Sequence, residues 1–291
     1  MRLGKTLAAT IAVLALIAGT PKPSFAQVAP TPGILTDGNA VVTGFSGTQP
    51  PILIAPGTDP ADKTTIDLAG PSARIVDLQA PASPPQAQLL QAPKPFTVTA
   101  SQVGQVFAVA LDNANPPNIY VAATSAYGLP IVVPDANGDG LPDRVKQGAP
   151  NASFMPGLFG LLDQGGGPGS IWRIGGTTGD VRLFANVMLD GVPNSGPALG
   201  GLAFDAASNS LFVADRDTGM IHRFDLSGVD SGHYDHGTQG RSAAGLPPVP
   251  FDPTNRLDIT SPQFKTDDPA TWAYAPPERR IFGLAVHACQ A

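Results

Sequence analysis

The most specific chemical signal in the sequence is a run in which oxygen-bearing side chains alternate with other residues. Its donors are the side chains of the first, third, fifth and ninth residues and the main-chain carbonyl of the seventh: Asp135, Asn137, Asp139, Asp143 and Leu141. Glycine at the sixth position, Gly140, permits the sharp turn that such a loop needs. Because Ca²⁺ prefers hard oxygen ligands, the spacing predicts a structural calcium site.

This loop is similar to the calcium loops of thrombospondin-type repeats, dockerins and integrin propellers, and it departs from a complete EF-hand. Lys146 stands where the bidentate glutamate would be, and no helical pattern flanks the loop. Arg144 and Lys146 should also weaken cation binding electrostatically. The alternative interpretation is a cluster of Asn, Asp and Gly turn residues that binds no ion.

A second group of candidate metal ligands lies in a glycine-rich stretch. His233, Asp235 and His236 could ligate Zn²⁺ or another transition metal, but the stretch has no periodic pattern that would fix their geometry. A solvated or hydrogen-bonded loop is the interpretation that this spacing favours. His222 alternates with apolar residues in period two, which predicts a histidine on a strand that faces the core.

Signatures of nucleophilic catalysis are missing from the sequence. It contains no Gly-x-Ser-x-Gly motif and no Ser-x-x-Lys motif, and the single cysteine, Cys289, lies close to the end of the chain. The glycine-rich run 165–169 precedes an expected strand rather than opening a helix, so it does not fit a phosphate-binding loop. We therefore predict no catalytic residues.

The elements that would position these side chains follow an export signal. Two basic residues, Arg2 and Lys5, precede the apolar stretch 7–18, and the small residues of Ser24–Ala26 fit a signal-peptidase site. We expect residues 1–26 to be a signal peptide of a bacterial protein that is periplasmic or secreted. The apolar stretch is too short to span a bilayer, and we expect no membrane span in the mature chain.

Composition restricts both the fold and the partners. The 291 residues include 33 glycines and 32 prolines, and only 14% are charged, which favours a turn-rich, all-β protein over helical folds. The formal net charge is −6, and the signal carries three of the basic residues, so the mature chain would be more acidic still. An acidic surface repels phosphate backbones, so we expect no nucleic-acid partner. A single cysteine leaves packing or metal to hold the exported fold.

Two stretches repeat the pattern of a short apolar strand, a polar turn and a second apolar strand. They cover 109–122 and 202–215, and each is followed by further strand candidates, at 170–185 and 220–226. The Gly-Leu-Ala phrase that opens the second copy recurs at 283–287. A four-stranded antiparallel unit that recurs in this way is typical of a propeller blade.

The wording of residues 199–226 resembles the blades of NHL-type and gluconolactonase-like six-bladed propellers. The resemblance is looser over 104–187 and ends before about residue 60. It implies an all-β propeller, with a β-sandwich as the alternative fold. Gluconolactonase-like propellers hold a divalent metal on their axis through Glu, Asn and Asp, but this chain has no Glu before Glu278, which leaves that ligand set unmatched.

The chain is expected to have a leader and a partial propeller after the signal. Residues 27–100 form a leader and a linker rich in Pro and Ala, with a β-hairpin at 65–78. Residues 101–291 form two to three blades, and long insertions separate the strands. The insertion over 125–169 carries the calcium loop. A third blade would have only its first strand, so we expect a truncated, incomplete propeller whose open faces support self-association.

Two classes of function fit these expectations. The first is an exported, calcium-stabilised binding or structural module that presents its loops to a protein or carbohydrate ligand. The alternative is a metal-dependent, lactonase-like hydrolase of the six-bladed group, inactive if the propeller is truncated. The unmatched metal ligands favour the binding module.

Overall fold

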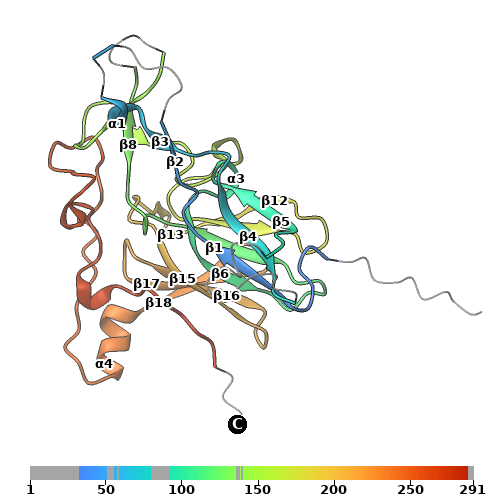
Figure 1. Cartoon of the computed structure of the whole chain (residues 1–291). Coiled ribbons are helices and arrows are strands. Elements are labelled where there is room, and N and C mark those ends of the chain that lie inside the picture. The colour runs from blue at the N-terminus through green and yellow to red at the C-terminus, as the bar shows by residue number, and fades with distance from the viewer. Residues whose placement is uncertain are drawn as a thin grey trace, which may run out of the picture. The chain divides into compact units, whose positions relative to one another are not determined.

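The computed structural model describes residues 33–50, 56–57, 59–79, 92–135, 138 and 140–287. This part of the chain consists of antiparallel β-sheets with a few short helices, and its sheets form no closed barrel (Figure 1). The all-β class expected from composition is confirmed. The expected signal peptide, residues 1–26, and residues 80–91 of the expected linker lie outside the described residues.

One four-stranded antiparallel sheet unites the strands of the first sequence repeat. Its strands, in spatial order, are β6 (Val106–Leu111), β7 (Ile119–Ala123), β11 (Ser170–Ile174) and β12 (Val181–Asn186). Spatial order follows chain order, and residues 124–169 are inserted between the second and third strands. All five residues of β7 are buried, as its unbroken apolar run predicts for a strand covered on both faces.

A second four-stranded antiparallel sheet contains the second repeat. Its strands, again in chain order, are β15 (Leu199–Asp205), β16 (Ser210–Asp215), β17 (Met220–Asp225) and β18 (Asp230–Asp235). The fourth strand corrects the interpretation of the stretch around His233 and Asp235 as a loop. β18 is a polar, mostly exposed edge strand, so it lacks the apolar alternation by which strands are recognised in a sequence.

A third sheet joins three strands that precede residue 100. β4 (Pro71–Asp77) lies between β1 (Asn39–Thr43) and β5 (Phe96–Thr99). The hairpin expected at 65–78 is wrong, because β3 (Thr65–Ile66) pairs with β2 (Thr48–Gln49). Both edges of β4 are already paired with other strands. The short helix α3 (Ala100–Val103) follows β5.

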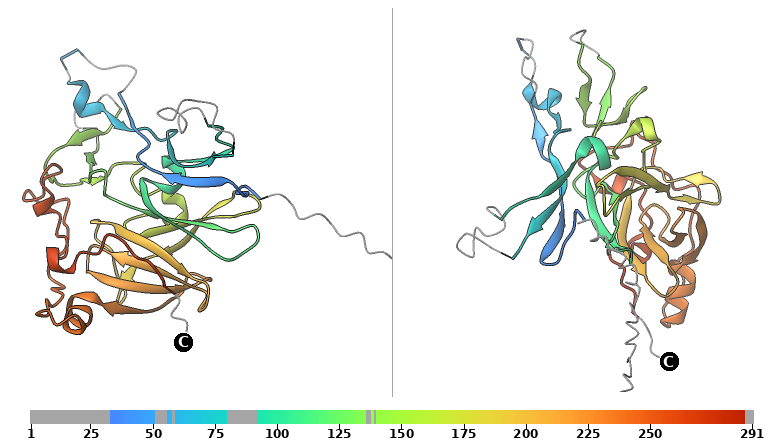
Figure 2. Two further views of the ribbon diagram at one scale, coloured as in Figure 1. Left: turned by 60° about the horizontal axis from the view of Figure 1, so that its bottom comes forward. Right: turned by 90° about the vertical axis from the view of Figure 1, so that its right-hand side faces the viewer.

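The three sheets stack face to face through two hydrophobic layers (Figure 2). β7 divides its side chains between the layers by strand alternation. Ile119 and Val121 pack toward the β1-β4-β5 sheet, whereas Tyr120 and Ala122 pack toward the β15–β18 sheet. Trp172 is fully buried in the first layer, and its indole nitrogen donates a hydrogen bond to the carbonyl of Phe159 at 3.1 Å.

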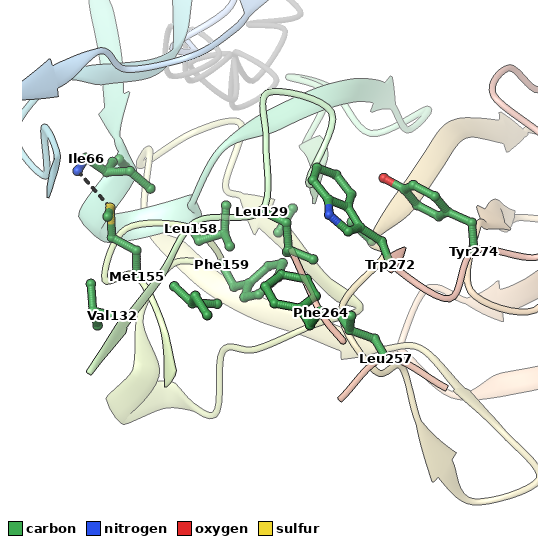
Figure 3. Close-up of a cluster of buried hydrophobic side chains, with 14 residues drawn as sticks. Ile66, Leu129, Val132, Met155, Leu158, Phe159, Leu257, Phe264, Trp272 and Tyr274 are labelled. Carbon is green, nitrogen blue, oxygen red and sulfur yellow. Dashed lines mark hydrogen bonds between the residues drawn. The ribbon is translucent and has the colours of Figure 1, made fainter. Parts of the chain in front are cut away.

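The insertion after β7 has secondary structure of its own and packs against the C-terminal part of the chain. β8 (Ile131–Val133) lies between β10 (Ser153–Phe154) and β9 (Asp143–Val145). Its buried side chains meet those of the later segment 257–274 in a common core (Figure 3). The remaining short elements are α1 (Pro60–Lys63), η1 (Leu162–Gln164), β13 (Met188–Leu189), β14 (Val192–Pro193), η2 (His236–Gly240), α4 (Arg241–Ala243), η3 (Pro269–Thr271) and η4 (Pro277–Arg279).

The strand expected at 280–287 does not form, since these residues have no regular structure. The segment instead runs against β15 at Gly200 and Gly201. A Cβ atom on Gly200 would overlap the carbonyl oxygen of Ile281, and one on Gly201 would lie 2.8 Å from the main-chain nitrogen of Leu284. The two glycines therefore permit a close backbone approach in place of a third strand pair.

Candidate functional site

The expected calcium loop is partly described. Asn137 and Asp139 lie outside the described residues, whereas Asp135, Leu141 and Asp143 lie within them. The two carboxylate oxygens of Asp135 accept hydrogen bonds from the main-chain nitrogens of Gly138 and Gly140, each at 2.6 Å. Asp135 thus turns back over its own loop, as the first residue of a tight Asx-type turn does.

The ammonium group of Lys63 lies on two of the expected calcium ligands. Its Nζ is 2.9 Å from a carboxylate oxygen of Asp143 and 3.3 Å from the carbonyl oxygen of Leu141. Lys63 ends helix α1, which Asp59 caps by accepting from the nitrogen of Ala61, and its side chain is 1% exposed. A cation is therefore already present at this loop. Sequence spacing could not reveal it, because 78 residues separate Lys63 from Leu141.

The second group of candidate ligands does not come together as a metal site. His233 lies exposed on β18 opposite His222, with 5.8 Å between their ring centroids, and His236 begins η2. Asp235 forms an ion pair with Arg279 at 2.9 Å instead of turning toward a shared ion. Within the described part of the chain, no group of three His, Cys, Asp or Glu side chains could hold a metal ion.

Buried carboxylates at the end of β16 form a polar centre that the sequence analysis missed. Asp215 accepts hydrogen bonds from the amide of Asn194 and the hydroxyl of Thr218, both at 2.7 Å. Asp217 accepts from the main-chain nitrogen of Ser195 at 2.6 Å and from its hydroxyl at 3.0 Å. Burial, and then the charge of Asp215, raises the pKa of Asp217 to about 6. The sequence signal for this centre is the pair Asp215 and Asp217 in the turn that follows an apolar strand.

His222 connects this centre to the edge strand β18. The ring is fully buried, its Nδ1 lies 2.9 Å from a carboxylate oxygen of Asp230, and its Nε2 lies 3.7 Å from one of Asp215. Burial lowers the pKa of His222, but the contacts with Asp215 and Asp230 outweigh burial and leave that pKa raised. The core-facing strand position predicted for His222 is thus observed.

The ends of the central strands are filled by the protein's own groups. After β7, the hydroxyl of Ser125 donates to the carbonyl of Pro197 at 2.7 Å and lies 3.0 Å from the hydroxyl of Tyr274. After β16, the guanidinium of Arg216 lies over the rings of Tyr274 and Phe282, at 4.5 and 4.7 Å from their centroids.

A separate pocket of about 200 Å³, lined by none of these residues, lies between the loops after β1 and β7 and the strand β9. Phe45 and Tyr127 stack beside it, with ring centroids 5.8 Å apart, and both are about 43% exposed. Its floor belongs to the core shown in Figure 3 and consists of the apolar residues Ile66, Leu129, Met155 and Leu158. Arg144 and Lys146 contribute positive charge to the wall.

No protein-family model matches the chain, and no curated protein and no solved structure shows significant similarity to it. The fold and the pocket therefore have to be interpreted from their own chemistry. Among the described residues, no helix is both long enough and apolar enough to cross a membrane.

Proposed function

We propose that this chain is an exported, calcium-stabilised binding module of the propeller type, which holds a small ligand in the pocket beside Phe45 and Tyr127. The observation that carries the proposal is the contrast between two places in the fold. The pocket combines an apolar floor, exposed aromatic rings and charged groups, as ligand sites do. The carboxylates at the strand ends are buried and are used by neighbouring protein groups.

The arrangement of the sheets supports a propeller rather than a sandwich. Each four-stranded sheet runs through its strands in chain order, and the first strand of the second sheet, β15, packs along β6 and β7 of the first. Adjacent first strands are expected where blades surround an axis, because the inner strands of a propeller lie side by side. The described sheets form an open stack, and self-association through its outer faces remains part of the proposal.

Calcium at the 135–143 loop is the second part of the proposal. The loop retains the oxygen donors of Asp135, Leu141 and Asp143, while Lys63 supplies the competing positive charge. Bound calcium would crosslink the loop through the side chains of the loop itself, whereas Lys63 connects the loop to helix α1. The two cations therefore oppose each other electrostatically at one site.

The pocket test compares two tryptophan substitutions on one short strand. Thr48 lines the pocket and Gln49 does not, although both are exposed on β2 and successive side chains of a strand point to opposite faces. A small-molecule library is screened by thermal shift on the mature wild-type protein. We expect compounds that raise Tm for wild type and for Gln49→Trp, and whose effect is lost in Thr48→Trp.

The alternative hydrolase is tested with the same preparation. Lactone and phosphotriester substrates are supplied with Ca²⁺, Mn²⁺ or Zn²⁺, and hydrolysis is followed. The binding module predicts no turnover above that of the metal alone. Metal-dependent turnover that survives Thr48→Trp would replace the binding module by an enzyme whose site lies elsewhere.

A further inference from the structure

We infer that the pocket takes small molecules that combine an aromatic ring with an anionic group, such as an aryl carboxylate, sulfonate or phosphate. The inference rests on the proposed binding function and names its ligand class. It follows from three properties of the pocket: the charge of one wall, the stacked rings at its rim and its volume.

The charged wall is basic although the chain as a whole is acidic. Arg144 lies on β9 and Lys146 follows directly after that strand, and both line the pocket. Neither side chain forms an ion pair with a carboxylate in the described part of the chain. Asp267 is the single acidic residue among those lining the pocket. In a chain of net charge −6, a pocket with two cations and one anion is a local site for negative charge.

The rim offers a face on which a flat ring can stack. Phe45 and Tyr127 come from different loops, and their planes are inclined by only 29°. Exposed aromatic rings in this arrangement bury apolar area and favour offset stacking with a further ring. A guanidinium in the adjacent wall can then bind the anionic group of the same molecule in a bidentate manner.

The walls are held in place by hydrogen bonds, and those made by Gln105 are buried. Gln105 is buried; its carbonyl oxygen accepts from the nitrogen of Ser46 at 2.9 Å, and its amide donates to the carbonyl of Gly157 at 3.1 Å. On the basic wall, the carbonyl of Lys146 accepts from the nitrogen of Thr266 at 2.9 Å. A site formed in advance loses little conformational freedom when a ligand binds.

The volume limits the ligand to one or two fused rings. About 200 Å³ is smaller than the roughly 300–1,000 Å³ of pockets that hold drug-sized ligands. The probes that match this size are naphthalene-2-sulfonate and its uncharged analogue 2-naphthalenemethanol. They share the ring system and differ in the charge of the substituent.

Isothermal titration calorimetry and saturation-transfer NMR measure both probes on the mature protein at two salt concentrations. We expect wild type to bind the sulfonate at least tenfold more tightly than the alcohol, with the preference weakened by salt. The double variant R144Q/K146Q should lose the preference, while R182Q/R241Q, which has the same net charge, should retain it. Asp267→Asn should increase the affinity for the sulfonate.

The outcomes separate the ligand class from the binding function. Equal affinities for the two probes, or a preference that survives R144Q/K146Q, overturns the anionic class. If Thr48→Trp blocks library compounds while wild type binds neither probe, the ligand class is wrong and the binding function stands. If neither the probes nor any library compound binds at the pocket, both proposals fall. Circular dichroism of each variant verifies that it is folded.

Discussion

Removal of the Lys63 ammonium should make the stability of the protein depend on calcium. The side chain of Lys63 is 1% exposed and that of Asp143 is 19% exposed, with 2.9 Å between Nζ and the carboxylate oxygen. Breaking a buried ion pair by removing one partner costs about 3–5 kcal/mol. Because water reaches part of Asp143, we expect Lys63→Met to lower the free energy of unfolding by the lower end of that range, about 3 kcal/mol.

Calcium should then restore the stability that the ammonium group of Lys63 contributed. A ligand that binds only the folded state at a hundred times its Kd stabilises that state by about 2.7 kcal/mol. Urea unfolding of wild type, Lys63→Met and the exposed control Lys265→Met is followed with EDTA and with a calcium titration. Without calcium, only Lys63→Met should be destabilised, and calcium should stabilise it more than it stabilises wild type. Asp143→Ala in the Lys63→Met background should abolish that gain.

Two results would refute this reasoning about the loop. If Lys63→Met is as stable as wild type in EDTA, the ion pair with Asp143 contributes nothing to the fold. If calcium stabilises wild type and Lys63→Met equally, the ammonium does not compete with the ion. An absence of any calcium effect in both proteins would leave the alternative interpretation, a turn cluster that binds no ion.

Three other predictions concern the buried charges around β17. Arg279→Met should lower the free energy of unfolding, measured in urea, by about 3–5 kcal/mol. The reason is that Arg279 is fully buried, donates to the carbonyls of Thr218 and Val249 and forms an ion pair with Asp235. An effect no larger than that of the neighbouring Arg280→Met would contradict this prediction. The pKa of Asp217 is raised to about 6, so the folded state favours the protonated carboxyl. The free energy of unfolding should therefore fall by up to about 3 kcal/mol as pH rises from about 4 to about 6. A dependence of stability on pH that is unchanged in Asp217→Asn would contradict this prediction. The pKa of His222 is raised, so the stability that its protonated ring contributes is full below about pH 6.5 and is lost as pH rises through the folded pKa. His222→Gln should flatten the dependence of stability on pH in that range.

The sequence allowed the interior strands to be predicted but not the polar edge of the fold. Strands β7 and β16 are apolar runs buried on both sides, so their type and their order in the sheets followed from the pattern. β18 is a polar edge strand held to β17, and only its neighbour makes it a strand. The segment after Arg280 repeats the phrase of β15, yet it packs against Gly200 without forming a strand.

The candidate site was predictable only where its residues are close in the sequence. The loop from Asp135 to Asp143 follows from local spacing, but Lys63 enters it from another element. The pocket joins Phe45, Tyr127 and Arg144 from three separate segments, and of these only Arg144 belongs to a motif, the calcium loop. Such long-range proximity depends on how the sheets stack, which local periodicity does not encode.

The binding function is tested most directly by mapping a bound probe on the protein. Two-dimensional ¹H–¹⁵N spectra are recorded while naphthalene-2-sulfonate is added, and each shifted backbone signal is assigned to its residue. The proposal predicts saturable shifts concentrated at the loops that carry Phe45 and Tyr127 and on β9 around Arg144, all lost in Thr48→Trp. Shifts that cluster instead at the strand ends around Asp215, or that persist unchanged in Thr48→Trp, would contradict the assignment of this pocket as the ligand site.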